Sequence, residues 1–462
     1  MTENSPKVNI PFTVVEITPA ARAASDRVLE SGWITTGKET LAFEQEWAAH
    51  VGAKHAVMVS SCTAALELCL RAMELPRGSK VLTTTTTFCG VINAIIHAGH
   101  VPVFADLAYP EEGADNVADS YMVSTRSVRE AAERAGGVDA MIVLHFAGHP
   151  ADVEALAQAA NLPLTRVIED AAHGIETFVG DRPVGSISLA TCFSFYPTKN
   201  LPMPEGGAIT TDDAAFEDKL RQLRLHGMST DAWKRYLPGG SWRYNVVTPG
   251  MKANMTDVQS AIGREQMKHL PRWQARRDEI VARFDRHLSR IEGLGLPTVS
   301  TIGKTAWHLY MIRILPTFGS ADSGHSGSAD SGHSGSADSG HSGAADSGHS
   351  GAADSAHSGS DGDHSGGHSG MTRDELIPFL NERGVATSVH FIPTHTMPAY
   401  AEHVPAGGLP NAELVFDQVV SLPLYPLLTD EQVDHICEVI RCAASASTGA
   451  ASTSAAPTPS VF

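Results

Sequence analysis

The first half of the chain alternates short apolar runs with amphipathic stretches, and this alternation restricts the possible folds more than any other feature. The apolar runs are rich in β-branched residues, which is typical of buried strands. Predicted strands cover residues 56–60, 81–85, 101–106, 141–146, 166–170 and 191–195. Predicted helices cover residues 19–31, 41–52, 63–73, 88–99 and 151–160. This alternation predicts a large α/β domain whose mixed, mostly parallel sheet is covered by helices.

The second half predicts a smaller domain of the α+β class. After residue 210 the pattern becomes helical, with a charged helical stretch that is interrupted at Pro271. The predicted elements are that helical stretch (255–290), a strand (307–314), a helix (371–384), a strand (387–391) and a helix near 429–441. We expect five parts: an extended arm (1–17), a large domain (18–265), a small C-terminal domain (266–317 and 371–442), an insert (318–370) and a disordered tail (443–462).

The insert, residues 318–370, is low in complexity. The unit SADSGHSG begins at 320 and recurs, with small changes, every eight residues through the unit that starts at 352. A histidine therefore recurs at every eighth position, which could indicate a weak metal-binding tract. We favour a flexible surface expansion, because Gly and Ser fix no coordination geometry and apolar residues are too few to fold. We predict no metal site.

Composition argues against several classes of protein. The net charge of −18 argues against nucleic acid or an anionic membrane as the main partner. The six cysteines are scattered, which indicates thiols of a reducing compartment and not a disulfide framework or a zinc site. The start of the chain has no apolar leader, and no run reaches membrane-spanning length. We therefore expect a cytoplasmic protein.

The stretch TCFSFYPTKNLPMPEGG (191–207) places a lysine directly after a predicted strand. Pro197 ends regular pairing, and Lys199 follows in an irregular segment with apolar neighbours. Poor hydration disfavours the ammonium form and lowers its pKa, which yields a nucleophilic amine. Such an amine forms Schiff bases with carbonyls, most often that of pyridoxal phosphate (PLP). A solvated loop lysine is the alternative.

Other groups that a PLP site requires have candidates at the ends of neighbouring strands. Residues 60–63 join a strand to a helix and offer free N–H groups and hydroxyls to a phosphate. Phe88 begins the next helix and could lie flat on a ring. Asp170 ends a strand, with His173 three residues later, and a carboxylate there could pair with a pyridine nitrogen. Ser194 could add a hydroxyl to the phosphate. A helix cap, a core aromatic and a solvent-facing serine are the structural alternatives.

Taken together, these residues resemble the DegT/DnrJ/EryC/StrS family of PLP-dependent sugar aminotransferases, which have the fold type I (aspartate aminotransferase-like) architecture. The resemblance covers about residues 12–317 and 371–441. It rests on the stretches SGWITTGKETLAFEQEWAAHVGAKHAVMVSSCTAALEL, VIEDAAHGIET, FSFYPTKNLPMPEGGAITTDD, LRLHGMSTDAW, TPGMKANMTDVQSAIG, AWHLYMIRI and GVATSVHFIPTHTMPAY. Within the family, the chain looks most like the UDP-4-amino-4-deoxy-L-arabinose–oxoglutarate aminotransferases.

The resemblance implies a role for each candidate residue. Lys199 would hold the cofactor covalently and move the proton, and Asp170 would pair with the pyridine nitrogen. His173 would reach the O3′ side of the ring, and Phe88 would stack on it. The remaining assignments are Cys62, Thr63 and Ser194 for the phosphate, and Lys252 and Asn254 for the active site of the neighbouring subunit in a homodimer.

The sequence of this chain can be compared with those of its relatives at three places in the site. Many relatives have glycine or alanine where this chain has Cys62, but only the backbone N–H is needed there. Many have Asn-x-Arg where this chain has Lys252-Ala253-Asn254. Relatives that dehydrate their substrate have histidine where this chain has Lys199, so the lysine favours amino transfer.

The implied reaction moves an amino group from an amino acid, glutamate by resemblance, to the keto carbon of a nucleotide-linked sugar. A ketocyclitol as the acceptor is one alternative. A non-enzymatic PLP-binding regulator is another, although the acidic charge and the lack of a helix-turn-helix candidate argue against DNA binding.

Overall fold

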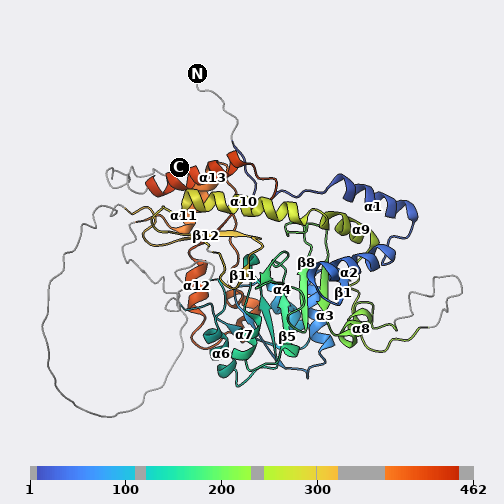
Figure 1. The fold of residues 1–462 in the computed structure, drawn as a ribbon. Coiled ribbons are helices and arrows are strands. Elements are labelled where there is room, and N and C mark those ends of the chain that lie inside the picture. Colours follow the sequence, from blue (N-terminus) through green and yellow to red (C-terminus); the bar gives the residue numbers. More distant parts are fainter. Residues whose placement is uncertain (1–7, 110–120, 230–243, 298, 321–369, 447–462) are drawn as a thin grey trace, which may run out of the picture.

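A seven-stranded sheet lies at the centre of the larger part of the molecule (Figure 1). The structure is a computed structural model that describes residues 8–109, 121–229, 244–297, 299–320 and 370–446. The strands are β1 (His55–Val59), β2 (Lys80–Thr84), β3 (Val101–Ala105), β4 (Ala140–Leu144), β5 (Val167–Asp170), β8 (Ala190–Ser194) and β9 (Gly207–Thr211). Their order in the sheet is β1-β9-β8-β5-β4-β2-β3.

The sheet is mixed and mostly parallel, as the sequence predicts. Strand β9 runs antiparallel to both of its neighbours, β1 and β8, and every other pair is parallel. Strand β9 was not predicted, because it follows two prolines and begins at the second residue of a glycine pair. The carboxyl ends of β1, β2, β4, β5 and β8 therefore meet at one edge of the sheet, where open α/β sheets bind their ligands.

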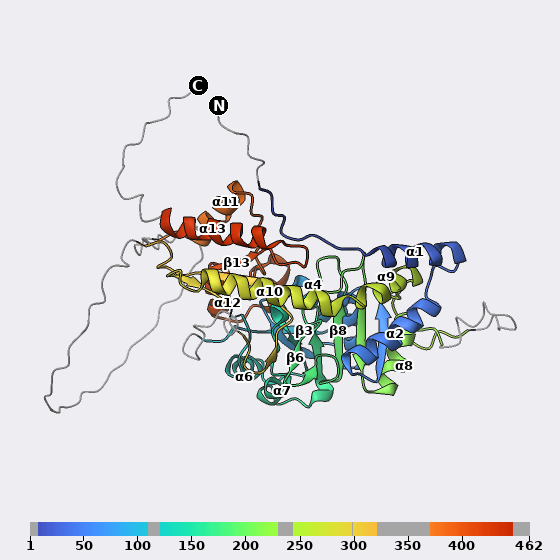
Figure 2. The same cartoon turned by 45° about the horizontal axis from the view of Figure 1, so that its top comes forward.

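Helices cover both faces of this sheet (Figures 1 and 2). They are α1 (Pro19–Ser31), α2 (Lys38–Val51), α3 (Cys62–Ala72), α4 (Cys89–His97), α6 (Thr125–Arg134), α7 (Val153–Ala159), α8 (Ala214–Leu223) and α9 (Asp257–Met267). Alternate residues of each strand point to opposite faces. Ile142 of β4 packs with α3 and α4, whereas Met141 and Val143 pack with α6 and α7. Burial on both faces accounts for the continuous apolar runs that predicted the strands.

Two helix starts show what local sequence does and does not decide. Helix α1 begins as predicted, because the Thr18 hydroxyl accepts a hydrogen bond from the Ala21 N–H and Pro19 occupies the first turn. Helix α2 begins three residues earlier than predicted. Its first N–H groups donate to the carboxylate of Asp257, which lies more than 200 residues away in the sequence.

A second, smaller part of the molecule is built around a three-stranded antiparallel sheet. Its strands are β10 (Leu294–Gly295), β12 (Tyr310–Ile314) and β13 (Val419–Leu422), and its helices are α10 (Leu270–Leu288), α11 (Arg373–Glu382) and α13 (Asp430–Ala446). Pro271 lies in the first turn of α10, where a proline is tolerated, so the break in the predicted helical stretch falls just before it. Trp273 of α10 packs in the core of the large part and Phe284 in that of the small part. This helix thus joins the two cores.

The predicted strand at 387–391 is wrong. Only Ser388 pairs with β13, through Ser421, and the chain then leaves the sheet edge. His390 and Phe391 line a cavity, and the N–H of Thr394 donates to the carbonyl of Thr85 at 2.9 Å. The alternating pattern of this segment is β-like, but its contacts with the large sheet override it. The predicted strand at 307–314 is present but shorter than predicted, because it begins only at residue 310.

Segment 394–416, which was predicted to belong to the small domain, contacts the large sheet. It includes α12 (Pro410–Phe416), whose first N–H groups donate to the Asp106 carboxylate at the end of β3. The Tyr400 hydroxyl donates to Asn93 of α4 at 2.8 Å. A short sheet of β11 (Gly303–Lys304), β6 (Phe178–Val179) and β7 (Arg182–Pro183) completes the structure. The domain boundaries stay a prediction.

Three predicted segments lie wholly or partly outside the described residues: the start of the arm, the histidine-containing repeat and the tail from 447 onward. Residues 443–446, predicted as tail, complete α13, and Ala443 is fully buried. Among the described helices, none is both long and apolar enough to cross a bilayer.

Candidate active site

A cavity of about 500 Å³ lies at the edge of the sheet where β1, β5 and β8 end. It is lined from the large part by the turns after these strands and from the small part by residues 390–391. Seven of the nine predicted site residues line it: Cys62, Thr63, Phe88, Asp170, His173, Ser194 and Lys199. Turns after parallel strands gather at one sheet edge, and this is why residues so far apart in sequence meet here.

Lys199 reaches the cavity from the turn that follows β8. The turn is closed by a hydrogen bond from the Lys199 N–H to the carbonyl of Tyr196 at 2.8 Å. Burial lowers the pKa of the Lys199 amine to about 8, although the nearby Asp170 carboxylate acts in the opposite direction. About a tenth of the amine is therefore uncharged at pH 7, and this fraction can act as a nucleophile.

Asp170, the last residue of β5, is buried beside the cavity. Its Oδ1 accepts a hydrogen bond from the Ala172 N–H at 2.9 Å and faces the Cys62 thiol at 3.8 Å. Burial raises the pKa of Asp170, and burial together with this carboxylate holds the pKa of Cys62 far above its usual range. Cys62 therefore stays a thiol and donates to Asp170, which leaves the second carboxylate oxygen for another partner.

The amino end of α3 offers an anion site on the same cavity. The Ser61 hydroxyl caps the helix by accepting from the Ala64 N–H at 3.1 Å. The N–H groups of Cys62 and Thr63 donate to no atom of the described residues, and the helix dipole points its positive end at them. A Cβ at Gly207 would lie 2.8 Å from the Cys62 nitrogen, so only glycine lets β9 approach this turn.

Aromatic rings form another wall of the cavity. The Phe88 ring is 60% exposed and lies 6.2 Å from that of Phe391, so it is free to cover a flat ligand. A Cβ at Gly90 would come within 2.6 Å of the Thr63 hydroxyl and 3.2 Å of the Phe88 ring. Glycine at this position thus lets α3 and Phe88, the residue before α4, come together around the cavity.

Two neighbouring imidazoles, those of His173 and His308, lie 4.2 Å apart between their ring centres, with their planes tilted by 31°. Nδ1 of His173 accepts a hydrogen bond from the Ala147 N–H at 3.2 Å, so its Nε2 carries the proton. Burial lowers the pKa of both histidines well below the usual range, which keeps them uncharged. His173 therefore presents a neutral N–H donor.

Several residues of the cavity were not predicted from the sequence: Phe12 and Thr13 of the arm, His308, His390 and Phe391. His308 lies in the motif AWHL, which was noted without a role. His390 and Phe391 were assigned to a strand. The arm carries no sequence signal of its own, and only the structure shows that it covers the cavity.

Lys252 and Asn254, the other two predicted residues, do not line the cavity of this chain. The exposed Lys252 ammonium donates to the Asn254 side chain, whose amide donates to the Thr36 hydroxyl at 2.7 Å. A contribution to the active site of a neighbouring subunit stays a prediction.

The residues of the cavity fit the parts of PLP. The uncapped N–H groups of α3 suit its phosphate, the free Asp170 oxygen suits its pyridine nitrogen, and the Lys199 amine suits its aldehyde.

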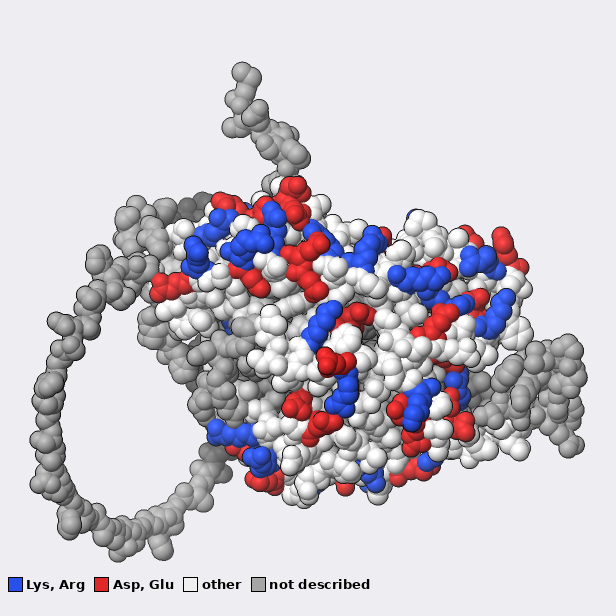
Figure 3. All heavy atoms as spheres, viewed as in Figure 1, with Lys and Arg blue, Asp and Glu red and all other residues white. Residues whose placement is uncertain are grey.

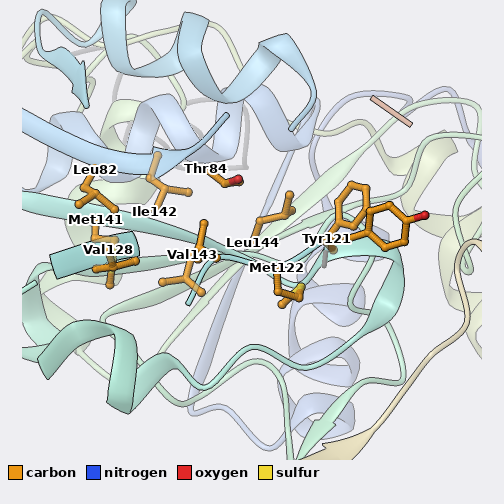
Figure 4. A pocket seen from close by; sticks show the side chains of 11 residues that line it. Leu82, Thr84, Tyr121, Met122, Val128, Met141, Ile142, Val143 and Leu144 are labelled. Atoms are coloured by element: carbon orange, nitrogen blue, oxygen red, sulfur yellow. The ribbon is translucent and has the colours of Figure 1, made fainter. Parts of the chain in front are cut away.

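A second cavity, between β4 and Tyr121, holds only about 10 Å³ and is lined mostly by apolar side chains (Figure 4). It has room for one water at most and is a packing gap.

The charged residues on the face seen in Figure 3 do not separate by sign, because basic and acidic side chains are mixed there. Many charged side chains of the described residues form ion pairs, as Arg283 does with Asp434 and Arg276 with Asp430. Such a face has no large field of one sign that would attract a polyanion or polycation.

Comparisons with known proteins agree on one group. The DegT/DnrJ/EryC1/StrS aminotransferase family model matches residues 16–323 and 365–441. The chain is 39% identical over 416 residues to the spore coat polysaccharide biosynthesis protein SpsC of Bacillus subtilis, covering 89% of this chain and 91% of that protein.

Solved structures are similar as well. The PMP form of the sugar aminotransferase Spr1654 of Streptococcus pneumoniae superposes with a TM-score of 0.74 at 25% identity, covering 95% and 98% of the two chains. DesV of S. venezuelae gives 0.69 at 28% identity, covering 92% and 94%. Spr1654 is also known in a PLP form. These likenesses confirm the predicted fold type I architecture.

Proposed function

This chain belongs to the DegT/DnrJ/EryC1/StrS aminotransferase family, and we propose that it moves an amino group from glutamate to the keto carbon of a nucleotide-linked sugar. As a member it is a PLP-dependent sugar aminotransferase. One observation of the structure supports amino transfer in addition to family membership. Lys199, whose amine has a pKa of about 8, shares a cavity with Asp170 and with the open amino end of α3.

Bound PLP supplies an electron sink for the breaking of a C–H bond next to nitrogen. In our proposal Lys199 would hold the cofactor and, once displaced by the amino donor, its Nζ would take up the proton from the carbon next to the amino nitrogen and deliver it to the carbon on the other side of that nitrogen. Because glutamate and the ketosugar use the same cavity in turn, the kinetics are expected to be ping-pong.

The remaining cavity residues would bind the PLP cofactor and fix its orientation. Asp170 would keep a proton on the pyridine nitrogen, and the Nε2–H of His173 would donate to the O3′ oxygen. Ser194 and the amino end of α3, at Cys62 and Thr63, hold the phosphate. Phe88 covers the ring and limits the access of water. These assignments rest on the geometry given above and on family resemblance.

The acceptor and the assembly are also part of the proposal. Relatives named as sugar aminotransferases and a relative in spore coat polysaccharide biosynthesis support a sugar acceptor. That the acceptor sugar is linked to a nucleotide remains a prediction from the sequence motifs. The particular resemblance to the UDP-4-amino-4-deoxy-L-arabinose–oxoglutarate aminotransferases remains one as well. We further propose a homodimer whose subunits share active sites through Lys252 and Asn254. A cytoplasmic location is supported by six unpaired cysteines.

The test is a substrate panel. Purified protein with PLP is incubated with glutamate and with nucleotide-linked ketosugars, free ketosugars or ketocyclitols, and 2-oxoglutarate is measured. We expect multiple turnovers with a nucleotide-linked ketosugar. Turnover with ketocyclitols alone would replace the acceptor, and binding of PLP without turnover on any acceptor would favour a regulator.

A further inference from the structure

Two segments far apart in the sequence are joined at one wall of the cavity. Both the N–H and the hydroxyl of Thr394 donate to the carbonyl of Thr85, each at 2.9 Å. The His395 N–H donates to the Thr85 hydroxyl at 3.2 Å, and Nδ1 of His395 lies 2.7 Å from the same oxygen. On the other side, Nε2 of His395 lies 2.9 Å from the Glu413 carboxylate. We call Thr85, Thr394, His395 and Glu413 the Thr85 clasp.

The partners fix the direction of these hydrogen bonds. A carboxylate only accepts, so Nε2 of His395 carries a proton. In the neutral ring Nδ1 is then an acceptor, and the Thr85 hydroxyl donates to it while accepting from the His395 N–H. Thr85 and His395 are both buried, so losing one partner leaves polar atoms without water. The arrangement therefore specifies a single orientation of the ring.

The clasp lies next to two rings of the active site. Phe88 follows Thr85 by three residues, and Phe391 precedes Thr394 by three; both rings line the cavity, 6.2 Å apart. More distant contacts, such as that of Tyr400 with Asn93, hold the rest of the segment. The clasp thus joins the two chain segments by several hydrogen bonds at a distance of three residues from each ring.

We propose that His395 is a positioning residue of the active site: through Thr85 it sets the spacing between Phe88 and Phe391. The inference rests on the proposed function, because it assigns Phe88 to the face of the cofactor. A ring that stacks on the cofactor must be held at a fixed height, and small displacements reduce both the tightness of binding and the rate. His395 itself touches no reacting atom.

The first test compares two neighbouring valine variants of the holoenzyme. Thr85→Val removes the clasp hydroxyl. Thr86→Val makes the same change one residue later, at a buried hydroxyl that has no hydrogen-bond partner among the described residues. We expect Thr85→Val to release PLP about tenfold faster, as for one lost buried hydrogen bond, and to weaken the visible circular dichroism of bound PLP. Thr86→Val should match the wild type in both.

A second pair tests His395 itself. The amide of His395→Asn lies near the position of Nδ1 and can still accept from Thr85, whereas that of His395→Gln reaches toward Glu413 instead. We expect His395→Asn to keep the dichroism and the slow PLP release of the wild type, and His395→Gln to behave like Thr85→Val. A purely structural contact would lower the melting temperature of both variants and leave the dichroism per bound PLP unchanged.

The outcomes separate the two proposals. If Thr85→Val and Thr86→Val give the same PLP release rate and the same dichroism, the positioning role of His395 is wrong. It is also wrong if His395→Gln stays closer to the wild type in these two quantities than His395→Asn does. If the wild-type protein binds PLP but aminates no acceptor, the proposed function fails while the comparison of dichroism and release still decides the clasp.

Discussion

At the scale of single residues, two opposing effects act on the Lys199 amine. Burial lowers its pKa, the largest effect, and the carboxylate of Asp170 partly offsets this, leaving a pKa of about 8 against an ordinary value of 10.5. About half of the amine is then uncharged at pH 8, where less than about one per cent of an ordinary lysine is.

We therefore expect acylation of Lys199 in the PLP-free protein to accelerate with rising pH, with a midpoint near 8. The rate is followed by peptide mass spectrometry, with the exposed Lys252 of the same sample as an internal control. Lys199→Ala identifies the modified peptide. A midpoint near that of the exposed lysine would contradict the low pKa.

Asp170 is the second residue whose environment predicts a measurable effect. A carboxylate that holds a proton on the pyridine nitrogen acts mainly on the chemical step, so Asp170→Asn should slow turnover by about two to four decades. PLP affinity, measured by fluorescence titration, should fall much less. Asp152→Asn is the control, because Asp152 only caps α7 and asparagine caps equally well. Near-normal turnover of Asp170→Asn would mean that its carboxylate is structural.

At the scale of elements, the N-terminal arm connects the small core to the cavity. Ile10 is fully buried in that core, and its N–H and carbonyl pair with the backbone of Gly384 and Ala386. Two residues later Phe12 lines the cavity and stacks on His390, with ring centres 5.7 Å apart. The arm is therefore a structural part of the molecule from Ile10 onward.

Ile10→Ala should lower the free energy of unfolding by about 2–5 kcal/mol, the range for a large-to-small change in a core. Urea denaturation measures this, and Val8→Ala, at a position that is 45% exposed, is the matched control with an expected change near zero. Equal effects of the two variants would show that the arm does not contribute to the core.

At the scale of the whole molecule, the insert begins and ends at neighbouring points of the small domain. The N–H of Met371 donates to the carbonyl of Phe318 at 2.9 Å, so a short connection can replace the residues between them. The replaced sequence has too few apolar residues to build a core.

A short Gly-Ser linker in place of residues 321–369 should therefore leave the melting temperature and turnover nearly unchanged. Thermal denaturation and the amino-transfer assay measure these, with the intact chain as the reference. A large fall in either would assign the histidine repeat a folded or metal-bound role.

A shared active site predicts complementation between two inactive variants. If Lys252 serves the neighbouring subunit, a mixed dimer of Lys199→Ala and Lys252→Ala has one site with both changes and one with neither. Refolding equal amounts together makes about half of the dimers mixed, so activity should return to about a quarter of the wild type.

The complementation test requires Lys252→Ala alone to be impaired. A fully active Lys252→Ala, or a mixture as inactive as its parents, would exclude the contribution across subunits. Recovery near a quarter of wild-type activity would support both the dimer and the placement of Lys252.

The sequence by itself predicted six of the seven strands of the large sheet and placed the main candidate site residues at their ends. Buried parallel strands need continuous apolar runs, and these give a signal that is local and strong. The turns after such strands meet at one edge, so Lys199, Asp170 and Thr63 could be assigned to one site from their positions alone. Family motifs then added the cofactor and the reaction class.

Only the tertiary structure decided the rest of the cavity and several element boundaries. Helix α2 begins at residue 38 because the distant Asp257 caps it, and segment 387–391 leaves its sheet because the residues that follow bond to Thr85. The arm, His308 and His390 reach the cavity through contacts across the two parts of the molecule. Such contacts depend on long-range packing, and local patterns of hydrophobicity do not encode them.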